Sequence, residues 1–142
     1  MTIKIQKLHP DAILPKYACK DDAGMDFYAL ETTTIMPSER KTIPTGIRMA
    51  IPSGYVGLIW DKSGIALKHG MTTIGGVIDA GYRGEITILL HNLSTQLFTI
   101  EKGQKIAQML IQPVEQKEII EVSELDLNTQ RGQGGFGSTG LR

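Results

Sequence analysis

The residues best suited to chemistry lie near the end of the chain, in the segment Arg131-Gly-Gln-Gly-Gly-Phe-Gly-Ser-Thr-Gly140. Five of its ten positions are glycine, which lets backbone N–H groups approach a ligand closely. A cation, an aromatic face and two hydroxyls stand among these glycines, so the segment is equipped to fold over an aromatic ring and a chain of phosphates. The alternative is a solubilising end with no ligand. The residues that carry the first interpretation are Arg131, Phe136, Gly137, Ser138 and Thr139.

A second candidate is the stretch Gly75-Gly-Val-Ile-Asp-Ala-Gly-Tyr-Arg-Gly-Glu85. Val77 and Ile78 indicate the end of a strand, which Asp79 follows, and Ala80-Gly81 is typical of a tight turn. Asp79 is then either an Asx-type turn residue or a carboxylate at the rim of a pocket. In the pocket hypothesis Tyr82 forms a wall, and the backbone near Gly76 recognises the edge of a base.

Three further polar groups are weaker signals when each is taken alone. Asp61-Lys-Ser-Gly-Ile-Ala66 places Lys62, Ser63 and Gly64 before one short helix, where free N–H groups attract phosphate; Ser63 is equally suited to be a plain N-cap. Asp26, in Ala23-Gly-Met-Asp-Phe27, stands at a predicted strand entrance and is either a structural turn residue or a site carboxylate. Gln108 is polar within the apolar run that follows Lys102-Gly-Gln-Lys105, so it points either to solvent or into a site.

The elements that must position these residues are almost all strands. Period-two alternation and flanking Gly, Pro and Asn predict many short strands, which is typical of a sandwich, jelly roll or barrel. Helical periodicity is confined to residues 63–68, with a stop at His69-Gly70. We expect an all-β domain over 1–127 and a flexible glycine-rich lid over 128–142. The segments expected to be strands are 3–5, 47–51, 55–60, 77–78, 85–91, 98–100, 106–111 and 118–122.

Composition restricts the function further. The 142 residues include 15 Lys and Arg and 15 Asp and Glu, so no basic field indicates nucleic acid or an anionic membrane. No apolar run is long enough to span a bilayer, and residues 1–10 lack the apolar core of a signal peptide. Cys19 is the only cysteine, which excludes an internal disulfide. We expect a cytoplasmic protein, or one of the host-cell interior if its source is viral.

Taken in order, AGMD, DKSGIA, GGVIDAGYRGE, KGQKIAQM and RGQGGFGSTG resemble the five motifs of the trimeric deoxyuridine triphosphatases (dUTPases). The resemblance runs from about Ala23 to Gly140 with the family's order and spacing. It implies an all-β, jelly-roll-like β-barrel or sandwich subunit with one short helix. It also implies a homotrimer with active sites at subunit interfaces, Mg²⁺ as cofactor, and hydrolysis of dUTP to dUMP and pyrophosphate. That activity keeps uracil out of DNA and supplies dUMP for thymidylate synthesis.

The resemblance also implies roles for individual residues. Asp79 is the base for the water that attacks the α-phosphorus, and Tyr82 packs under the deoxyribose and excludes a 2′-hydroxyl. The hairpin backbone, including Gly76, Val77 and Ile78, pairs with uracil, and Phe136 stacks over it from the lid. Asp26 contacts the magnesium ion only indirectly, through water, because the triphosphate is the main ligand of the metal. The residues implied to contact the phosphates or the attacking water are Lys62, Ser63, Gly64, Gln108, Arg131, Gly137, Ser138 and Thr139.

One residue departs from the family pattern, because Lys62 stands where arginine is usual. Lysine keeps the charge but lacks the bidentate fork of arginine. Two other functions stay open. The first is a dCTP deaminase-type enzyme of the same fold, although such enzymes are generally longer and lack this complete tail. The second is a dUTPase-like protein that binds nucleotide in order to regulate a protein partner, although the connections between the motifs are short and show no insertion.

Overall fold

Antiparallel strands form most of the regular secondary structure, as the alternating pattern predicts. The computed structural model describes residues 2–136, 138 and 140. Its elements in chain order are β1 (Lys4–Lys7), β2 (Met25–Tyr28), β3 (Thr33–Ile35), β4 (Arg40–Ile43), β5 (Ile47–Ala50), β6 (Tyr55–Asp61), α1 (Ser63–His69), β7 (Met71–Thr73), β8 (Val77–Ile78), β9 (Ile88–Asn92), β10 (Phe98–Ile100) and β11 (Lys105–Pro113).

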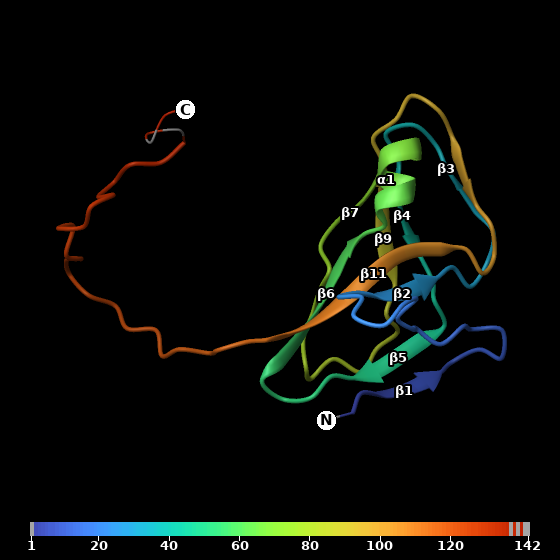
Figure 1. Ribbon diagram of the computed structural model, residues 1–142, viewed down its shortest axis with the longest axis horizontal. Helices are drawn as coiled ribbons and strands as arrows, with labels where there is room; N and C mark the ends of the chain where they lie inside the picture. Colours follow the sequence, from blue (N-terminus) through green and yellow to red (C-terminus); the bar gives the residue numbers. More distant parts are fainter. Residues whose placement is uncertain (1, 137, 139, 141–142) are drawn as a thin grey trace.

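The strands form two main sheets and two small ones. The larger sheet has the order β2-β11-β6-β8, and a three-stranded sheet has the order β4-β9-β7. The pairs β1-β5 and β10-β3 complete an all-β, jelly-roll-like body (Figure 1). The long strands β6 and β11 form a central antiparallel ladder, in which Tyr55 pairs with Pro113 at one end and Asp61 pairs with Ala107 at the other. Most of the candidate residues lie on this ladder or beside it.

The core is aliphatic, with methionine and phenylalanine filling the remaining space. Its burial supplies the main driving force for folding, because removal of apolar surface from water is favourable. The buried core residues are Ala12, Met25, Phe27, Ala29, Ile35, Ile43, Ile47, Met49, Ile51, Ile59, Met71, Ile86, Ile88, Leu90, Phe98, Ile100, Ile106, Ala107 and Met109.

The short helix forms where the sequence predicts it, but its cap differs. Lys62 is the N-cap residue and makes no side-chain cap hydrogen bond, so the expectation that Ser63 caps the helix is wrong. Ser63 is instead the first helical residue, and its backbone belongs to the free N-terminal turn. Gly70 ends the helix in the left-handed conformation with φ 66°, as expected. Among the described residues, no helix has the length and apolar character that crossing a bilayer requires.

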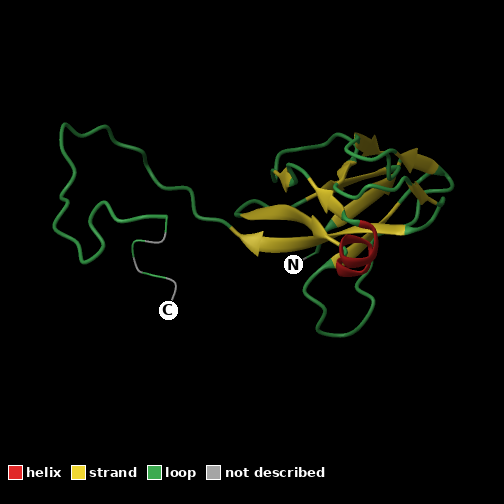
Figure 2. Cartoon of the chain, turned by 90° about the horizontal axis from the view of Figure 1, so that it is seen from above, coloured by secondary structure: helices red, strands yellow, loops and turns green. Residues whose placement is uncertain are grey.

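The strand expected over 118–122 is wrong. The described residues after Pro113 form no strand, and they extend away from the body (Figures 1 and 2). The apolar residues that suggested the strand have no surface of their own chain to cover, and Ile119 is 97% exposed. The strand expected over 85–91 begins only at Ile88. The sequence interpretation also missed β3, β4 and β7, and of β2 it predicted only the entrance, at Asp26.

Candidate functional site

Asp79 lies on a hairpin at one edge of the larger sheet. β8 leads into it and pairs with β6 through Ile78–Gly57 and Val77–Leu58. The backbone closes the turn, because Tyr82 N donates to Asp79 O at 3.0 Å. Among the described residues, the side-chain hydrogen bonds of this turn come from Tyr82 and Arg83, and none comes from the Asp79 carboxylate. An Asx-type turn is therefore absent from this part of the chain, and the exposed carboxylate is available for chemistry.

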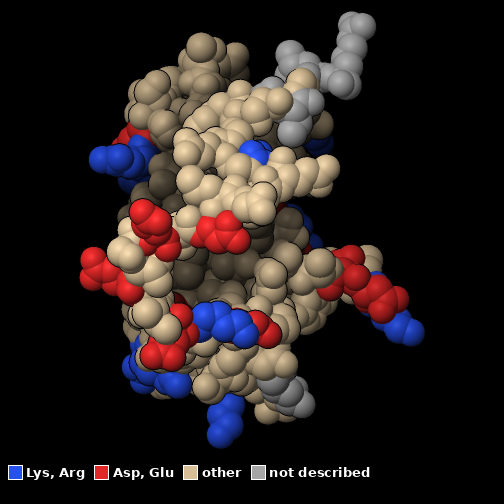
Figure 3. All heavy atoms as spheres, turned by 90° about the vertical axis from the view of Figure 1, so that its left-hand side faces the viewer, with Lys and Arg blue, Asp and Glu red and all other residues tan. Residues whose placement is uncertain are grey.

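Two hollows adjoin Asp79. The smaller has a volume of about 130 Å³ and is lined by Val77, Ile78, Asp79, Tyr82, Glu85 and Thr87. The larger, of about 690 Å³, also touches the start of the tail, by which we mean the residues that follow Pro113. Figure 3 views the molecule from the side on which the tail leaves, where acidic and basic side chains both border a hollow. Neither hollow is lined by a Lys or Arg of the described chain. The larger is lined by Ser53, Gly54, Tyr55, Val56, Leu58, Val77, Asp79, Ala80, Gly81, Gln112, Pro113, Val114 and Gln116.

Gly76 fixes how closely the hairpin approaches β6. Its carbonyl accepts a hydrogen bond from Ile59 N at 2.8 Å, and its φ is +99°. A Cβ at this position would lie 2.9 Å from the Cβ of Ile59, closer than side chains tolerate. The backbone on which Asp79 is mounted therefore needs glycine at 76 for both its conformation and its packing.

Tyr82 is held on the side of the smaller hollow. Its hydroxyl donates to Glu85 O at 2.9 Å, and Glu85 Oε1 accepts from Gly46 N at 2.7 Å. Thr45 Oγ1 donates to Ile86 O at 2.5 Å, so a second bond ties the hairpin to the connection between β4 and β5. The ring is thus fixed to a part of the body that is remote in sequence.

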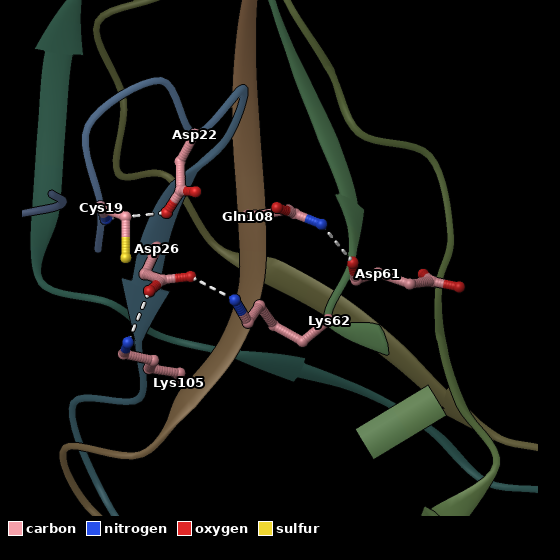
Figure 4. Close-up of polar contacts among 7 residues, drawn as sticks. All are labelled: Cys19, Asp22, Asp26, Asp61, Lys62, Lys105 and Gln108. Carbon is pink, nitrogen blue, oxygen red and sulfur yellow. Dashed lines mark hydrogen bonds and ion pairs between the residues drawn. The ribbon is translucent and has the colours of Figure 1, made fainter. Parts of the chain in front are cut away.

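A second cluster forms around Asp26, whose carboxylate is buried in β2 (Figure 4). Its Oδ1 lies 2.6 Å from Lys62 Nζ, and its Oδ2 lies 2.7 Å from Lys105 Nζ. The Asp26 side chain is 2% exposed, whereas those of Lys62 and Lys105 are 28% and 43% exposed. A buried carboxylate therefore holds two ammonium groups that still reach solvent.

The two lysines keep Asp26 ionised. Burial alone raises the pKa of Asp26, but the hydrogen bonds and charges of Lys105 and Lys62 outweigh it, so the pKa lies below its usual value. Asp26 in turn raises the pKa of Lys105. The cluster carries one net positive charge. Lys105 was missed as a candidate, and the signal that could have found it is a lysine inside the quoted motif, directly before the strand predicted over 106–111.

Gln108 joins the strands beside this cluster. Its Nε2 donates to Asp61 O at 2.9 Å, and a side chain on Gly24 would collide with Gln108, so the amide is half-buried rather than directed freely to solvent. Asp61 was also missed. Its carboxylate accepts hydrogen bonds from Thr73 N at 2.6 Å and Thr72 Oγ1 at 3.0 Å, and so anchors the end of β6 just before Lys62.

Ser63 and Gly64 lie at the exposed start of α1, next to the lysine that Asp26 holds. A Cβ on Gly64 would meet no atom within 4 Å, so this turn is open to a ligand. The first turn of the helix contains no acidic side chain. Lys62, Ser63, Gly64 and Gln108 are therefore brought together around Asp26.

The hairpin and the Asp26 cluster lie at opposite corners of the sheet. β2 and β8 are its two outer strands, three strand spacings apart, which is roughly 14 Å. Along β6, Ile78 pairs with Gly57, four residues before Asp61, which adds roughly 13 Å. One chain thus presents two half-sites. In the first, no Lys or Arg of the described residues pairs with the Asp79 carboxylate, and in the second, two lysines pair with the ionised Asp26.

The tail residues are exposed and lie away from both half-sites. Arg131 Nε donates to Gly134 O at 2.9 Å, and Ser138 N donates to Gly135 O at 3.0 Å, so the segment bonds only locally here. Phe136 is fully exposed. Gly137 and Thr139, which were expected to bind substrate, lie outside the described residues.

Comparison with known proteins gives a consistent result. A family model described as dUTPase matches residues 10–140. The deoxyuridine 5′-triphosphate nucleotidohydrolases of Clostridium kluyveri and Nautilia profundicola are 49% and 50% identical over 142 residues, and each match covers 99% of both chains. The solved dUTPase of Staphylococcus bacteriophage 80alpha with dUPNHPP has a TM-score of 0.93 at 32% identity and 99% coverage of both chains. A mutant dUTPase from phage phi11 of S. aureus, described with a structural Mg(II) ion, has a TM-score of 0.83 at 29% identity, covering 89% of this chain and 99% of that one.

Proposed function

The chain belongs to the dUTPase family, and we propose that it hydrolyses dUTP to dUMP and pyrophosphate with Asp79 as the general base. The observation that carries the assignment of the base is the free, exposed carboxylate of Asp79 between two hollows, on a hairpin that the rest of the fold holds in place. The family match favours this activity over the dCTP deaminase alternative.

In the proposed reaction, Asp79 orients a water and takes its proton as the water oxygen bonds to the α-phosphorus. The bond from the α-phosphorus to the bridging oxygen breaks, and pyrophosphate leaves with that oxygen. Asp79 is suited to this role because no cation of the described chain pairs with its carboxylate. A carboxylate engaged by two lysines, as in Asp26, would be a poorer proton acceptor.

The smaller hollow is the proposed place for the nucleoside. The peptide groups of Gly76, Val77 and Ile78 pair with the uracil edge, and the tight approach of this backbone to β6 leaves little room for the methyl group of thymine. Tyr82 packs under the deoxyribose. Its fixed hydroxyl, bonded to Glu85 O, makes the ring a rigid wall where a ribose would place its 2′-hydroxyl.

The phosphates need positive charge that the lining of the Asp79 hollows does not supply. We assign that charge to Lys62, together with the hydroxyl and N–H groups of Ser63 and Gly64 and the amide of Gln108. These residues belong to the other half-site, so the chain that supplies Asp79 and the chain that supplies Lys62 are different copies. This division supports the proposed homotrimer, in which each site combines parts of several subunits.

The exposed tail supports the same assembly. Ile119, Ile120 and Leu125 are largely exposed in the described part of the chain, and a neighbouring subunit can bury them. Beyond them, Arg131 and Ser138, with Gly137 and Thr139, would contact the phosphates of a site on another subunit while Phe136 stacks on uracil. Closure excludes bulk water and completes the phosphate shell.

Magnesium is the proposed cofactor and enters as the metal complex of dUTP. The described residues contain no group of three or more His, Cys, Asp or Glu side chains suited to holding a metal ion. Mg²⁺ keeps several waters and binds substrate phosphates readily, so this donor set fits a nucleotide-held ion. Asp26 can contact the waters of the ion, but its two oxygens are engaged by lysines and do not form a direct metal site.

One set of assays tests the proposal. Pyrophosphate release is measured with dUTP, dTTP, dCTP and UTP in the presence of Mg²⁺, together with ammonia release from dCTP. We expect release from dUTP at a kcat/KM far above that for the other three, and a molar mass by light scattering of three times 15.6 kDa. Ammonia from dCTP, or an active monomer, would contradict it.

A further inference from the structure

The ring of Tyr82 rests directly on the backbone of Gly84. A Cβ added to Gly84 would lie 3.0 Å from Tyr82 Cε2 and closer still to Cζ and the hydroxyl. Side-chain atoms in proteins do not approach the rigid part of a ring so closely. Any residue other than glycine at position 84 therefore displaces the tyrosine ring.

This requirement arises from packing rather than from backbone conformation. The φ of Gly84 is not positive, so alanine can adopt the same backbone. Gly81 in the same turn also lacks a positive φ, and a Cβ there would meet no atom within 4 Å. The two glycines of the hairpin therefore differ. The missing side chain of Gly84 leaves space for the Tyr82 ring, whereas no atom lies in the space that a side chain on Gly81 would fill.

A second contact holds the ring at its hydroxyl. Tyr82 Oη donates to Glu85 O at 2.9 Å, and the Glu85 carboxylate is itself bonded to Gly46 N at 2.7 Å. The ring lines the smaller hollow, whereas Gly84 does not. Because Gly84 lies against the ring, a side chain at position 84 can alter the hollow through Tyr82.

We propose that Gly84 is a positioning residue for sugar discrimination, because its missing side chain leaves space for the Tyr82 ring in the position where the ring closes the hollow against a ribonucleotide. The inference rests on the proposed function, in which Tyr82 packs under the deoxyribose. Alanine at 84 expels the ring towards solvent, where 44% of Tyr82 is already exposed, and breaks its bond to Glu85. The space left open then accepts a 2′-hydroxyl.

The experiment compares Gly84→Ala with Gly81→Ala, two substitutions of identical chemistry in one turn. The readout is the ratio of kcat/KM for UTP to kcat/KM for dUTP, since a general loss of active enzyme lowers both values and leaves the ratio unchanged. We expect Gly84→Ala to raise the ratio by roughly tenfold or more, within the range of discrimination by shape alone. Gly81→Ala should leave it as in wild type.

Tyr82→Ala and the double variant Tyr82→Ala/Gly84→Ala complete the test. If Gly84 acts through the ring, the double variant has the same ratio as Tyr82→Ala, because the second change has nothing left to displace. Should Gly84→Ala fail to fold, recovery of folding in the double variant supports the contact, and continued failure overturns the proposal.

The outcomes separate this inference from the function on which it rests. A wild-type chain that releases no pyrophosphate from dUTP contradicts the proposed function. An unchanged ratio in Tyr82→Ala contradicts the assigned role of the tyrosine. A raised ratio in Tyr82→Ala with a wild-type ratio in Gly84→Ala overturns the proposal for Gly84 alone.

Discussion

Lys62 Nζ lies 2.6 Å from Asp26 Oδ1, so the cation assigned to the phosphates is already held by a buried carboxylate of the same chain. A free lysine side chain loses considerable rotamer entropy when a ligand fixes it. Asp26 reduces that loss by holding the Lys62 ammonium next to the open turn at Ser63 and Gly64. Asp26 thereby positions Lys62, the residue that departs from the family pattern, although lysine lacks the bidentate fork of arginine.

We expect Lys62→Met to lower kcat/KM for dUTP by roughly 10–100-fold, because a charge-assisted hydrogen bond is worth about 1.5–3 kcal/mol. Lys62→Arg should retain most of the activity. The matched control is Lys102→Met, which removes an exposed lysine paired with Asp11 at 2.6 Å on the surface and should change little. Steady-state kinetics of the three variants measure these effects. Wild-type kinetics in Lys62→Met would mean that Lys62 pairs with Asp26 but does not bind the phosphates.

Asp26→Asn should destabilise the fold at neutral pH by about 1–3 kcal/mol, because it removes a buried, paired carboxylate. The pKa of Asp26 is lowered in the folded state: burial raises it, but Lys105 and Lys62 lower it more. The stabilisation is therefore complete above the unfolded pKa of about 3.9 and is lost as the pH falls through the lower folded value. Melting temperatures of both proteins at pH 7, 5, 4 and 3 measure this.

The difference in melting temperature between wild type and Asp26→Asn should be constant from pH 7 to 5 and shrink below about pH 4. Lys105 does not disturb this range. Asp26 raises the pKa of Lys105 above its ordinary value of about 10.4, so Lys105 stays protonated throughout this range and the pair is lost here only through protonation of Asp26. A difference that is undiminished at pH 3 would show that Asp26 stabilises by shape rather than by charge.

The central ladder and the helix could be predicted because their local patterns are strong. β6 and β11 contain apolar runs bounded by Gly, Pro and Lys-Gly, and Gly70 ends α1 as a left-handed cap. Only the entrance of β2 was predicted, because all four of its residues are buried and Asp26 shows no alternation with its neighbours. The strand expected over 118–122 failed for the opposite reason, since its apolar residues have no partner within the described chain.

For the site, the residue types and their spacing named Asp26, Lys62 and Gln108, but not the contacts that join them. The pairing of Asp26 with Lys105 depends on the register of β2 against β11, which is set by tertiary packing. The contact between Gly84 and Tyr82 is likewise invisible in sequence, where Gly81 and Gly84 both resemble ordinary turn glycines. Local patterns therefore indicated the chemistry, and long-range packing determined how each group is held.

Asp79→Asn should lower kcat for dUTP by roughly 10²–10⁴-fold, because the amide keeps the shape of the side chain but cannot accept the proton of water. Binding should persist, since the phosphate contacts lie on other residues. Turnover and equilibrium binding of a non-hydrolysable dUTP analogue measure the two effects separately. Near-normal turnover would make Asp79 a turn residue and refute the proposed base.

Truncation after Thr129 should leave the fold and the oligomer intact but remove most of the turnover. The described residues beyond Thr129 bond only to their own segment, so the body loses no contacts. Phe136→Trp gives a direct probe of closure, because Trp60 is the only other tryptophan. Its fluorescence should change when Mg²⁺ and the analogue are added together. Full activity of the truncated chain would mean that the tail is not a lid.

The proposed contribution of the tail to a site on another subunit predicts that two inactive chains can restore each other. Asp79→Asn chains keep the tail, and chains truncated after Thr129 keep Asp79. If each site takes Asp79 and the tail from different subunits, random mixing in a trimer leaves about one site in four with both parts intact. Co-refolded or co-expressed mixtures should then recover about a quarter of wild-type turnover, while each parent alone stays inactive. If one subunit had to supply both parts, every mixed site would lack one of them, and the mixture would be no more active than its parents.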